Sequence, residues 1–307
     1  MKKKWPVLSY QEGKATYETL QLFTQVVGKI KLATLPWTNH SWSITLHITP
    51  LGLTTQTMPY QDKDFQIDFD LITHHLKLST SLGESRQFSL EHISVAKFYE
   101  NIFKQLNELG IELAIMTLPS EISDPIPFEL DELHKGYDRL QATSFHTALL
   151  CIQNTFMIHR SGFKGKSSPI HFFWGGFDLA LAFFSGRKAP RHPGKMVGMP
   201  DWVLQDAYSH EVCDAGFWTG SPGLPEAAFY CYLYPEPNGY NTAEIAPEEA
   251  HYNHELGEFI LTYADVQKAS DPEAKLLEFL NSTYQVGAML ANWDPEFTKP
   301  IDMVRIV

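Results

Sequence analysis

The sequence contains few cysteines and an excess of acidic over basic residues. Its 307 residues include three cysteines, Cys151, Cys213 and Cys231, an odd number without CxxC spacing. Such a set is typical of reduced thiols and does not fit a disulfide framework. Lysine and arginine total 24 against 36 aspartates and glutamates, which gives a net charge of −12. A nucleic-acid-binding surface requires the opposite sign, so we expect no nucleic-acid partner.

Long apolar runs are also missing from the sequence. The longest apolar stretch, residues 169–184, contains His171 and Asp178 and falls short of the ~20 apolar residues that span a bilayer. Residues 5–12, WPVLSYQE, do not form the apolar core of a signal peptide. We therefore expect no membrane partner and a soluble, cytoplasmic protein.

The common catalytic and nucleotide-binding signatures are absent as well. The sequence has no GxGxxG after a predicted strand, no GxxxxGKS/T, no GxSxG and no HExxH. The composition, 44% hydrophobic and 20% charged, is that of an ordinary packed protein. A chain of this size buries enough surface to fold without metal or disulfides.

Apolar periodicity predicts two halves with a similar plan. Apolar residues recurring every three or four positions predict helices over residues 16–32, 94–109, 138–158 and 271–291. Alternating or apolar extended runs predict strands over residues 42–49, 65–71, 76–80, 88–90, 111–117, 172–184, 227–234 and 258–261. Antiparallel sheets with helices packed on one face give an α+β fold. Each half then follows a helix–strands–helix plan, and an internal duplication is left open.

An acidic, proline-rich stretch at residues 119–136 separates the two halves. We predict an N-terminal α+β half at residues 1–118, a linker at 119–136 that crosses the surface, and a C-terminal α+β half at 137–307. The C-terminal half contains a long loop, residues 186–226, with a short helix near 201–207. Loops of this length are often functional. The halves are able to join into one extended sheet with a cleft between them.

A glycine pair within an apolar run marks the strongest candidate for a site. Glycines at 175–176 predict a hairpin turn that pairs Phe173 with Asp178 and His171 with Ala180. His171 and Asp178 then lie diagonally on one face of the sheet, whereas a glycine bulge in one long strand would separate them. Two ionisable groups in so apolar a run need partners. They form either a structural pair or a polar binding site.

Other chemistry-bearing side chains concentrate in and beside the loop that follows. We predict His171 or His210 as base or metal ligand, Asp178 as the group that orients it, Arg187 as an anion clamp, and Glu211 as a further catalytic carboxylate. Candidate ligand-binding residues are Trp174, His192, Tyr208 and Trp218, with Tyr230, Tyr232 and Tyr234 as further stacking walls. The histidines and carboxylates have zinc-type ligand chemistry, but their spacing is loose, so the metal and any cofactor stay unassigned. His40 either joins from the first half or lies in a turn.

Several runs of the sequence are distinctive: PIHFFWGGFDLA at 169–180, FSGR at 184–187, YSHE at 208–211, and WPVL, TQVVGKI and YPEP elsewhere. Over residues 5–293 the chain resembles a bacterial family of conserved hypothetical proteins, a domain of unknown function. The resemblance implies one full-length unit. It brings no activity, substrate or cofactor.

Three functions from different classes fit these observations. The first is an enzyme that acts on a small polar or anionic molecule by general acid–base or metal-assisted hydrolysis. The second is a non-catalytic module that binds a small-molecule ligand, and the third is an interaction protein that pairs with a copy of itself. The oligomeric state is left open. The enzyme hypothesis depends on whether His171, Asp178, Arg187 and His210 converge on a single cavity.

Overall fold

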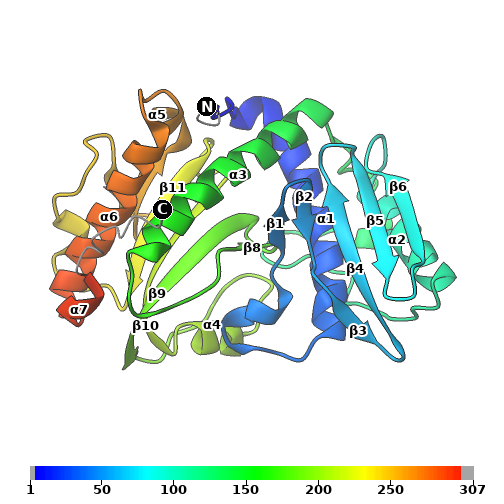
Figure 1. Cartoon of the computed structure of the whole chain (residues 1–307), viewed down its shortest axis with the longest axis horizontal. Helices are drawn as coiled ribbons and strands as arrows, with labels where there is room; N and C mark the ends of the chain where they lie inside the picture. Colours follow the sequence, from blue (N-terminus) through cyan, green and yellow to red (C-terminus); the bar gives the residue numbers. More distant parts are fainter. Residues whose placement is uncertain (1–3, 299–307) are drawn as a thin grey trace, which may run out of the picture.

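The chain forms an α+β fold with two antiparallel sheets, each built from one half of the sequence (Figure 1). The computed structural model describes residues 4–298, so the outer ends of the two predicted halves, residues 1–3 and 299–307, lie outside the described part. The predicted fold class is confirmed. The internal duplication stays open.

The first sheet has six strands in the order β1-β2-β4-β5-β6, with β3 paired to β4. Alternation in β4 buries Phe65, Ile67 and Phe69. On this buried face Phe98 of α2 stacks on Phe69, with ring centroids 6.1 Å apart, and on Phe23 of α1 at 4.1 Å. The elements are α1 (Tyr10–Thr34), β1 (His47–Thr49), β2 (Gly52–Thr54), β3 (Met58–Tyr60), β4 (Lys63–Asp70), β5 (His75–Thr80), β6 (Ser85–Ser89) and α2 (Val95–Glu108).

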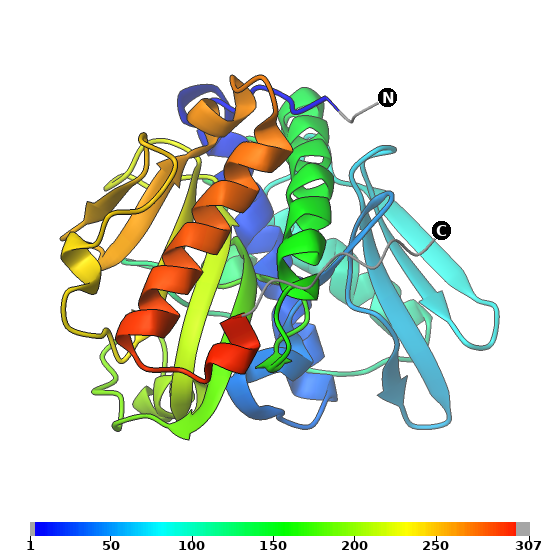
Figure 2. The same cartoon turned by 60° about the vertical axis from the view of Figure 1, so that its left-hand side comes forward.

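The second sheet has seven strands in the order β12-β13-β11-β10-β9-β7, with β8 paired to β9. Helices α3 and α6 lie side by side over one of its faces (Figure 2). The elements are α3 (Arg139–Ser161), β7 (Lys166–Ser167), β8 (His171–Phe173), β9 (Asp178–Lys188), α4 (Asp201–Ala207), β10 (His210–Trp218), β11 (Ala228–Tyr234), β12 (His251–Asn253), β13 (Glu258–Thr262), α5 (Tyr263–Gln267), α6 (Pro272–Leu290) and α7 (Pro295–Thr298). Short 3₁₀ helices η1 (Asn39–Ile44), η2 (Phe128–Leu130) and η3 (Tyr240–Thr242) complete the fold.

The helix starts follow from capping side chains. Ser94 accepts a hydrogen bond from the Lys97 N–H at the start of α2, and Asp138 and Asp271 cap α3 and α6 in the same way. A capping oxygen satisfies an N–H group that the first helical turn leaves without a partner. All three starts are visible in the sequence.

Side-chain alternation gives the seven-stranded sheet two different faces. Leu181, Cys213, Phe217 and Phe229 point to the face under α3 and α6 and belong to the main core. The residues between them point to the opposite face, because Ala180 pairs with Gly216, which pairs with Tyr230. By the same register this second face carries Asp178, Asp214, Tyr230, Tyr232 and Glu258. Segment 189–209 lies over it, so we name it the loop-covered face.

Three predicted elements are corrected by the structure. The strand expected at 42–49 is instead η1 followed by the short β1, with His40 and Ser41 at φ of 60° and 58°. Residues 111–117, expected as a strand, have no regular structure. The expected loop at 186–226 contains the end of β9, helix α4 and all of β10. The short helix near 201–207 is confirmed.

The two halves meet without forming one continuous sheet. Leu46, just before β1, and Phe172 of β8 exchange backbone hydrogen bonds of 2.8 and 2.9 Å. This isolated bridge brings η1 next to the hairpin of β8 and β9. Within residues 4–298, none of the helices combines the length and apolarity needed to cross a membrane.

Candidate functional site

A small cavity lies between the loop-covered face, α4 and η1. Its volume is about 150 Å³, the space of roughly five water molecules at ~30 Å³ each. We call it the acidic pocket, because three carboxyl groups line it. The lining residues are His40, Ser41, Glu121, Phe173, Gly176, Asp178, Ala180, Met196, Met199, Val203, Leu204, Ala207, Tyr208, Asp214, Tyr230 and Tyr232.

The first of these carboxyl groups belongs to Asp178, the first residue of β9. The Tyr230 hydroxyl donates a hydrogen bond of 2.6 Å to its Oδ2. Burial raises the pKa of Asp178 to about 6, against the opposing effect of the Tyr230 hydrogen bond. Desolvation disfavours the charged form of a carboxyl group, so Asp178 changes its charge near neutral pH.

The second carboxyl group is Asp214, at the centre of β10. Its side chain is 5% exposed, and its Oδ1 has no hydrogen-bond partner among the described residues. Burial, followed by the negative charge of Asp178, raises the pKa of Asp214 to about 8, although the Tyr232 hydroxyl opposes the shift. A buried acceptor without a partner costs free energy. Among the described residues, this atom therefore lacks the donor that a buried acceptor needs.

The third carboxyl group, Glu121, comes from the segment that joins the two halves. Gln25 of α1 holds the residue before it, because its Oε1 accepts from the Ser120 N–H at 2.8 Å and its Nε2 donates to the Ser120 carbonyl at 2.9 Å. Lys29 Nζ donates to Ser120 Oγ at 3.0 Å. Burial and the charge of Asp178 raise the pKa of Glu121 to about 7.

Glu121 and Asp178 approach each other beside the hairpin turn. A Cβ built on Gly176 would lie 2.8 Å from Asp178 Oδ1 and 3.7 Å from Glu121 Oε2. A Cβ on Gly175 would lie 1.9 Å from Glu121 Oε1. The glycine pair thus admits a second carboxyl group next to Asp178, in addition to forming the turn.

Aromatic side chains form the remaining walls of the acidic pocket. The hydroxyls of Tyr208 and Tyr232 are 2.6 Å apart and share a hydrogen bond. His192 stacks on Tyr208 with ring centroids 4.6 Å apart. Trp218 lies beside Tyr230 at 5.6 Å. Rigid aromatic walls of this kind surround many small-molecule sites.

His40 is the contribution of the first half. Its backbone N–H donates to Asp206 Oδ2 of α4 at 2.8 Å, and its Nδ1 is buried without a hydrogen-bond partner among the described residues. Burial lowers the pKa of His40 to about 4, so the imidazole is neutral at pH 7. The sequence leaves two interpretations of His40, a residue of the site or a residue of a turn. The structure favours the first, because His40 lines the acidic pocket.

The predicted hairpin register is confirmed, yet His171 and Asp178 are not each other's partners. Phe173 pairs with Asp178, and His171 pairs with Ala180. His171 is 1% exposed, and its Nδ1 lies 3.3 Å from Thr45 Oγ1. Burial lowers the pKa of His171 to about 3. It is a neutral core histidine outside the pocket lining, with a local partner.

The predicted anion clamp lies away from the pocket. Arg187 donates to Glu211 Oε2 and to the carbonyls of Ala291 and Asn292, which follow α6 on the helix-covered side. His210 is exposed, and its Nδ1 lies 3.1 Å from Ser209 Oγ. The expected convergence of His171, Asp178, Arg187 and His210 on one cavity is therefore not observed. Of the four, only Asp178 lines the pocket, because Arg187 and His210 lie at the other end of β9 and β10.

The predicted ligand-binding residues divide between wall and core. Tyr208 lines the acidic pocket, and His192 and Trp218 pack behind its walls. Trp174 is 7% exposed, and its Nε1 donates to the Ile44 carbonyl at 2.8 Å. Its indole packs against Gly28, where a Cβ would lie 2.3 Å from Nε1. Trp174 thus joins α1 to the hairpin.

A metal centre has no ligand set in the described part of the chain. Within residues 4–298, no group of three or more His, Cys, Asp or Glu side chains is arranged to hold a metal ion. The carboxyl groups of the acidic pocket are distributed around a cavity.

Two site residues were missed in the sequence. Asp214 is a lone acid in the apolar run Val212–Phe217, as Asp178 is in its own apolar run, but the sequence predicts a loop at this position. Glu121 lies in a stretch that looks like a solvated linker. Nothing local in the sequence indicates that α1 holds it against the hairpin.

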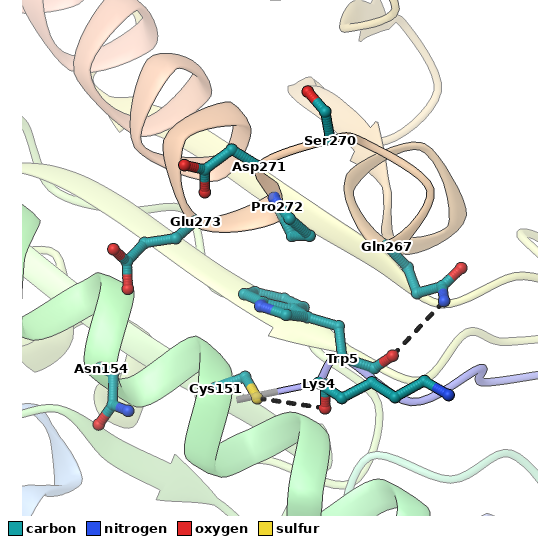
Figure 3. Close-up of a pocket in the computed structure, with 9 residues that line it drawn as sticks. All are labelled: Lys4, Trp5, Cys151, Asn154, Gln267, Ser270, Asp271, Pro272 and Glu273. Carbon is teal, nitrogen blue, oxygen red and sulfur yellow. Dashed lines mark hydrogen bonds between the residues drawn. The ribbon is translucent and has the colours of Figure 1, made fainter. Parts of the chain in front are cut away.

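A larger groove lies on the opposite side of the molecule, at the start of α6. Figure 3 shows Trp5 lying between α3 and the residues that begin α6. The groove has a volume of about 350 Å³. Its carboxyl groups, Asp271 and Glu273, are half-buried, and Gln267 donates to the Trp5 carbonyl at 3.4 Å. None of the charged side chains that line this groove is as buried as Asp214 of the acidic pocket.

Comparison with known proteins places the chain in a family. Residues 5–299 match the model of a family of unknown function, DUF5996. No curated protein and no solved structure matches the chain. The match covers nearly the whole sequence and includes every residue of the acidic pocket. The chain belongs to the DUF5996 family.

Proposed function

We propose that the acidic pocket is the active site of an enzyme that acts on a small polar molecule by general acid–base catalysis. The observation that carries the proposal is the approach of two carboxyl groups, Glu121 and Asp178, to one point beside Gly176. They come from different segments and meet at the wall of the acidic pocket, where both side chains are half-buried. Such carboxyl pairs support proton transfer in both directions.

The pKa values of the pair suit this chemistry. Burial raises the pKa of Asp178 to about 6 and that of Glu121 to about 7. Because adjacent negative charges repel, the pair titrates as a unit. At neutral pH one member of the pair is a carboxylate, which accepts a proton from the substrate. The other member is a carboxylic acid, which donates a proton to it. The Tyr230 hydroxyl occupies Asp178 Oδ2 and leaves Oδ1 toward the pocket.

The pocket chemistry also limits the substrate. None of the described lining residues is lysine or arginine, so an anionic substrate would meet buried carboxyl groups without a compensating cation. The volume of about 150 Å³ admits only a small molecule or the end of a larger one. We therefore narrow the expected substrate, a small polar or anionic molecule, to a polar molecule that is neutral or cationic.

A second candidate function is ligand binding without turnover. The shared hydrogen bond of Tyr208 and Tyr232 and the stacked His192 build a fixed wall, which binding proteins and enzymes use alike. Recovery of an unaltered ligand from the pocket would favour this alternative, and recovery of a product would favour catalysis.

Incubation with a small-molecule extract tests the proposal. Purified protein is mixed with the extract, and mass spectrometry records which compounds disappear and which form. We expect conversion of at least one compound by the wild type, and a loss of at least tenfold in D178N and in E121Q. D68N, which changes a carboxylate on β4 bonded to Gln66, is the matched control and should retain the wild-type rate. Conversion that survives both pocket variants would contradict the proposal.

A further inference from the structure

The acidic pocket brings carboxyl groups together without a lysine or arginine among the described residues that line it. Glu121, Asp178 and Asp214 line it, and Glu258 of β13 lies next to it on the same face of the sheet, in the row of Ile260 and Tyr230. For Glu121, Asp214 and Glu258 the charged neighbours that raise the pKa are other carboxylates. Buried carboxylates normally have a cation as partner, and the described lining supplies none.

The strongest single sign of a missing partner is Asp214 Oδ1. This atom is buried, accepts no hydrogen bond from any described residue, and belongs to a side chain that lines the cavity. His40, which also lines the pocket, has an Nδ1 that is likewise buried without a hydrogen-bond partner among the described residues. A group with several N–H donors would satisfy both atoms, whereas a carboxylate or phosphate has no N–H to donate to either of them.

The aromatic walls favour the same kind of ligand. Tyr208, Tyr230 and Tyr232 surround the carboxyl groups. Aromatic faces attract organic cations, and the attraction strengthens when the site excludes water. An inorganic cation needs converging ligands, which the described residues do not provide.

We propose that the acidic pocket recognises a small organic cation, a protonated amine on a short carbon skeleton, with Asp214 as its counter-ion and the tyrosines as its walls. This inference rests on the proposed function, because it names the substrate class of the same pocket. The ammonium group donates to Asp214 Oδ1, and its carbon skeleton lies against Tyr230 and Tyr232. Glu121 and Asp178 remain free for proton transfer.

Recognition of a cation also predicts a movement of protons. Burial raises the pKa of Asp214 to about 8, so the free protein holds this carboxyl group protonated at pH 7. A bound ammonium group favours the carboxylate. Asp214 then loses its proton, which passes to the buffer, while the amine keeps its own. Binding at pH 7 therefore releases up to about one proton per ligand.

Calorimetry with matched probes tests the inference. The probes are butylamine, 1,4-diaminobutane and ethanolamine, compared with the matched alcohols 1-butanol, 1,4-butanediol and 1,2-ethanediol and with butyrate, in two pH 7 buffers of different ionisation enthalpy. We expect at least one amine to bind the wild type at least tenfold more tightly than its matched alcohol, with proton release. In D214N we expect at least a tenfold loss of amine affinity and no proton release, and D68N should behave like the wild type.

The outcomes separate this inference from the proposed function. If an alcohol or butyrate binds as tightly as the amines, and D178N conversion is still lost, the substrate class is wrong and the active site stands. If no amine of the panel binds, the inference is overturned. If, in addition, D178N and E121Q convert the extract as the wild type does, the active-site proposal falls with it. The amine–alcohol comparison uses wild-type protein alone, so it holds even if a variant fails to fold.

Discussion

Replacing Asp214 by asparagine should stabilise the protein, increasingly so as the pH rises. Asp214 is buried, with Oδ1 unpartnered, and burial raises its pKa from 3.8 to about 8. Below about pH 4 the carboxyl group is protonated in both the folded and the unfolded chain and adds no pH dependence to the free energy of unfolding. Between pH 4 and 8 the unfolded chain releases this proton and the folded chain retains it. Stability is therefore lost as the pH rises through this window.

The magnitude follows from the width of the window. Each pH unit in which only the unfolded state ionises removes ~1.4 kcal/mol from the free energy of unfolding. Three units, from pH 5 to pH 8, give an upper bound of about 4 kcal/mol, which relaxation of the site reduces to roughly 2–4 kcal/mol. Asparagine has nearly the same shape and does not titrate, so D214N escapes this loss.

Urea unfolding at pH 5, 6, 7 and 8 measures the effect. The difference in free energy of unfolding between D214N and the wild type should grow in favour of D214N across the series. D68N, a matched change on the other sheet, reports any general effect of removing one negative charge. Parallel pH profiles for D214N and the wild type would refute the reasoning, because they would mean that Asp214 ionises normally in the folded protein.

Three further substitutions test the supports of the acidic pocket and its boundary. G175A places a Cβ 1.9 Å from Glu121 Oε1, so we expect a loss of ~1–3 kcal/mol in urea unfolding and at least a tenfold loss of conversion. Q25A removes two hydrogen bonds to Ser120 and should cost ~2–3 kcal/mol, with a comparable fall in amine affinity by calorimetry; unchanged affinity would show that α1 does not position Glu121. R187K breaks the half-exposed clamp on Glu211 and the end of α6, so thermal unfolding should register about 1 kcal/mol or less, with the conversion rate unchanged. A tenfold lower conversion rate in R187K would contradict this and would support the catalytic role that the sequence predicts for Arg187.

The parts of the fold that depend on local signals were predictable. The glycine pair and the alternating residues around it set the register of Phe173 with Asp178, because a tight hairpin leaves few alternatives. Caps such as Asp271 followed by Pro272 define where helices begin. These features need no knowledge of the rest of the chain.

In the segment before β1, tertiary contacts outweigh the alternating sequence pattern that predicts a strand. Residues 42–49 alternate as a strand does, yet Trp174 Nε1 donates to the Ile44 carbonyl and Lys31 Nζ to the Thr45 carbonyl at 2.6 Å. These donors come from the hairpin and from α1. They occupy carbonyls that a ladder would use, so the segment forms η1 instead of a full strand.

The site was only partly predictable because proximity in sequence is not proximity in space. Arg187 and Glu211 are close to Asp178 and Tyr208 along the chain. The bulge between His210 and Val212 lies where Arg187 and Glu211 meet the end of α6, away from the pocket. Glu121, by contrast, is distant in sequence and reaches the pocket through contacts with α1. Only the assembled fold brings the three carboxyl groups together.

A crystal structure of the protein soaked with the tightest-binding probe of the panel tests the central claim most directly. We expect the probe to lie in the acidic pocket, with its amine nitrogen within hydrogen-bond distance of Asp214 Oδ1 and its carbons against Tyr230. A probe that occupies the groove beside Trp5 or the Arg187–Glu211 clamp, with the acidic pocket left to solvent, would contradict the account.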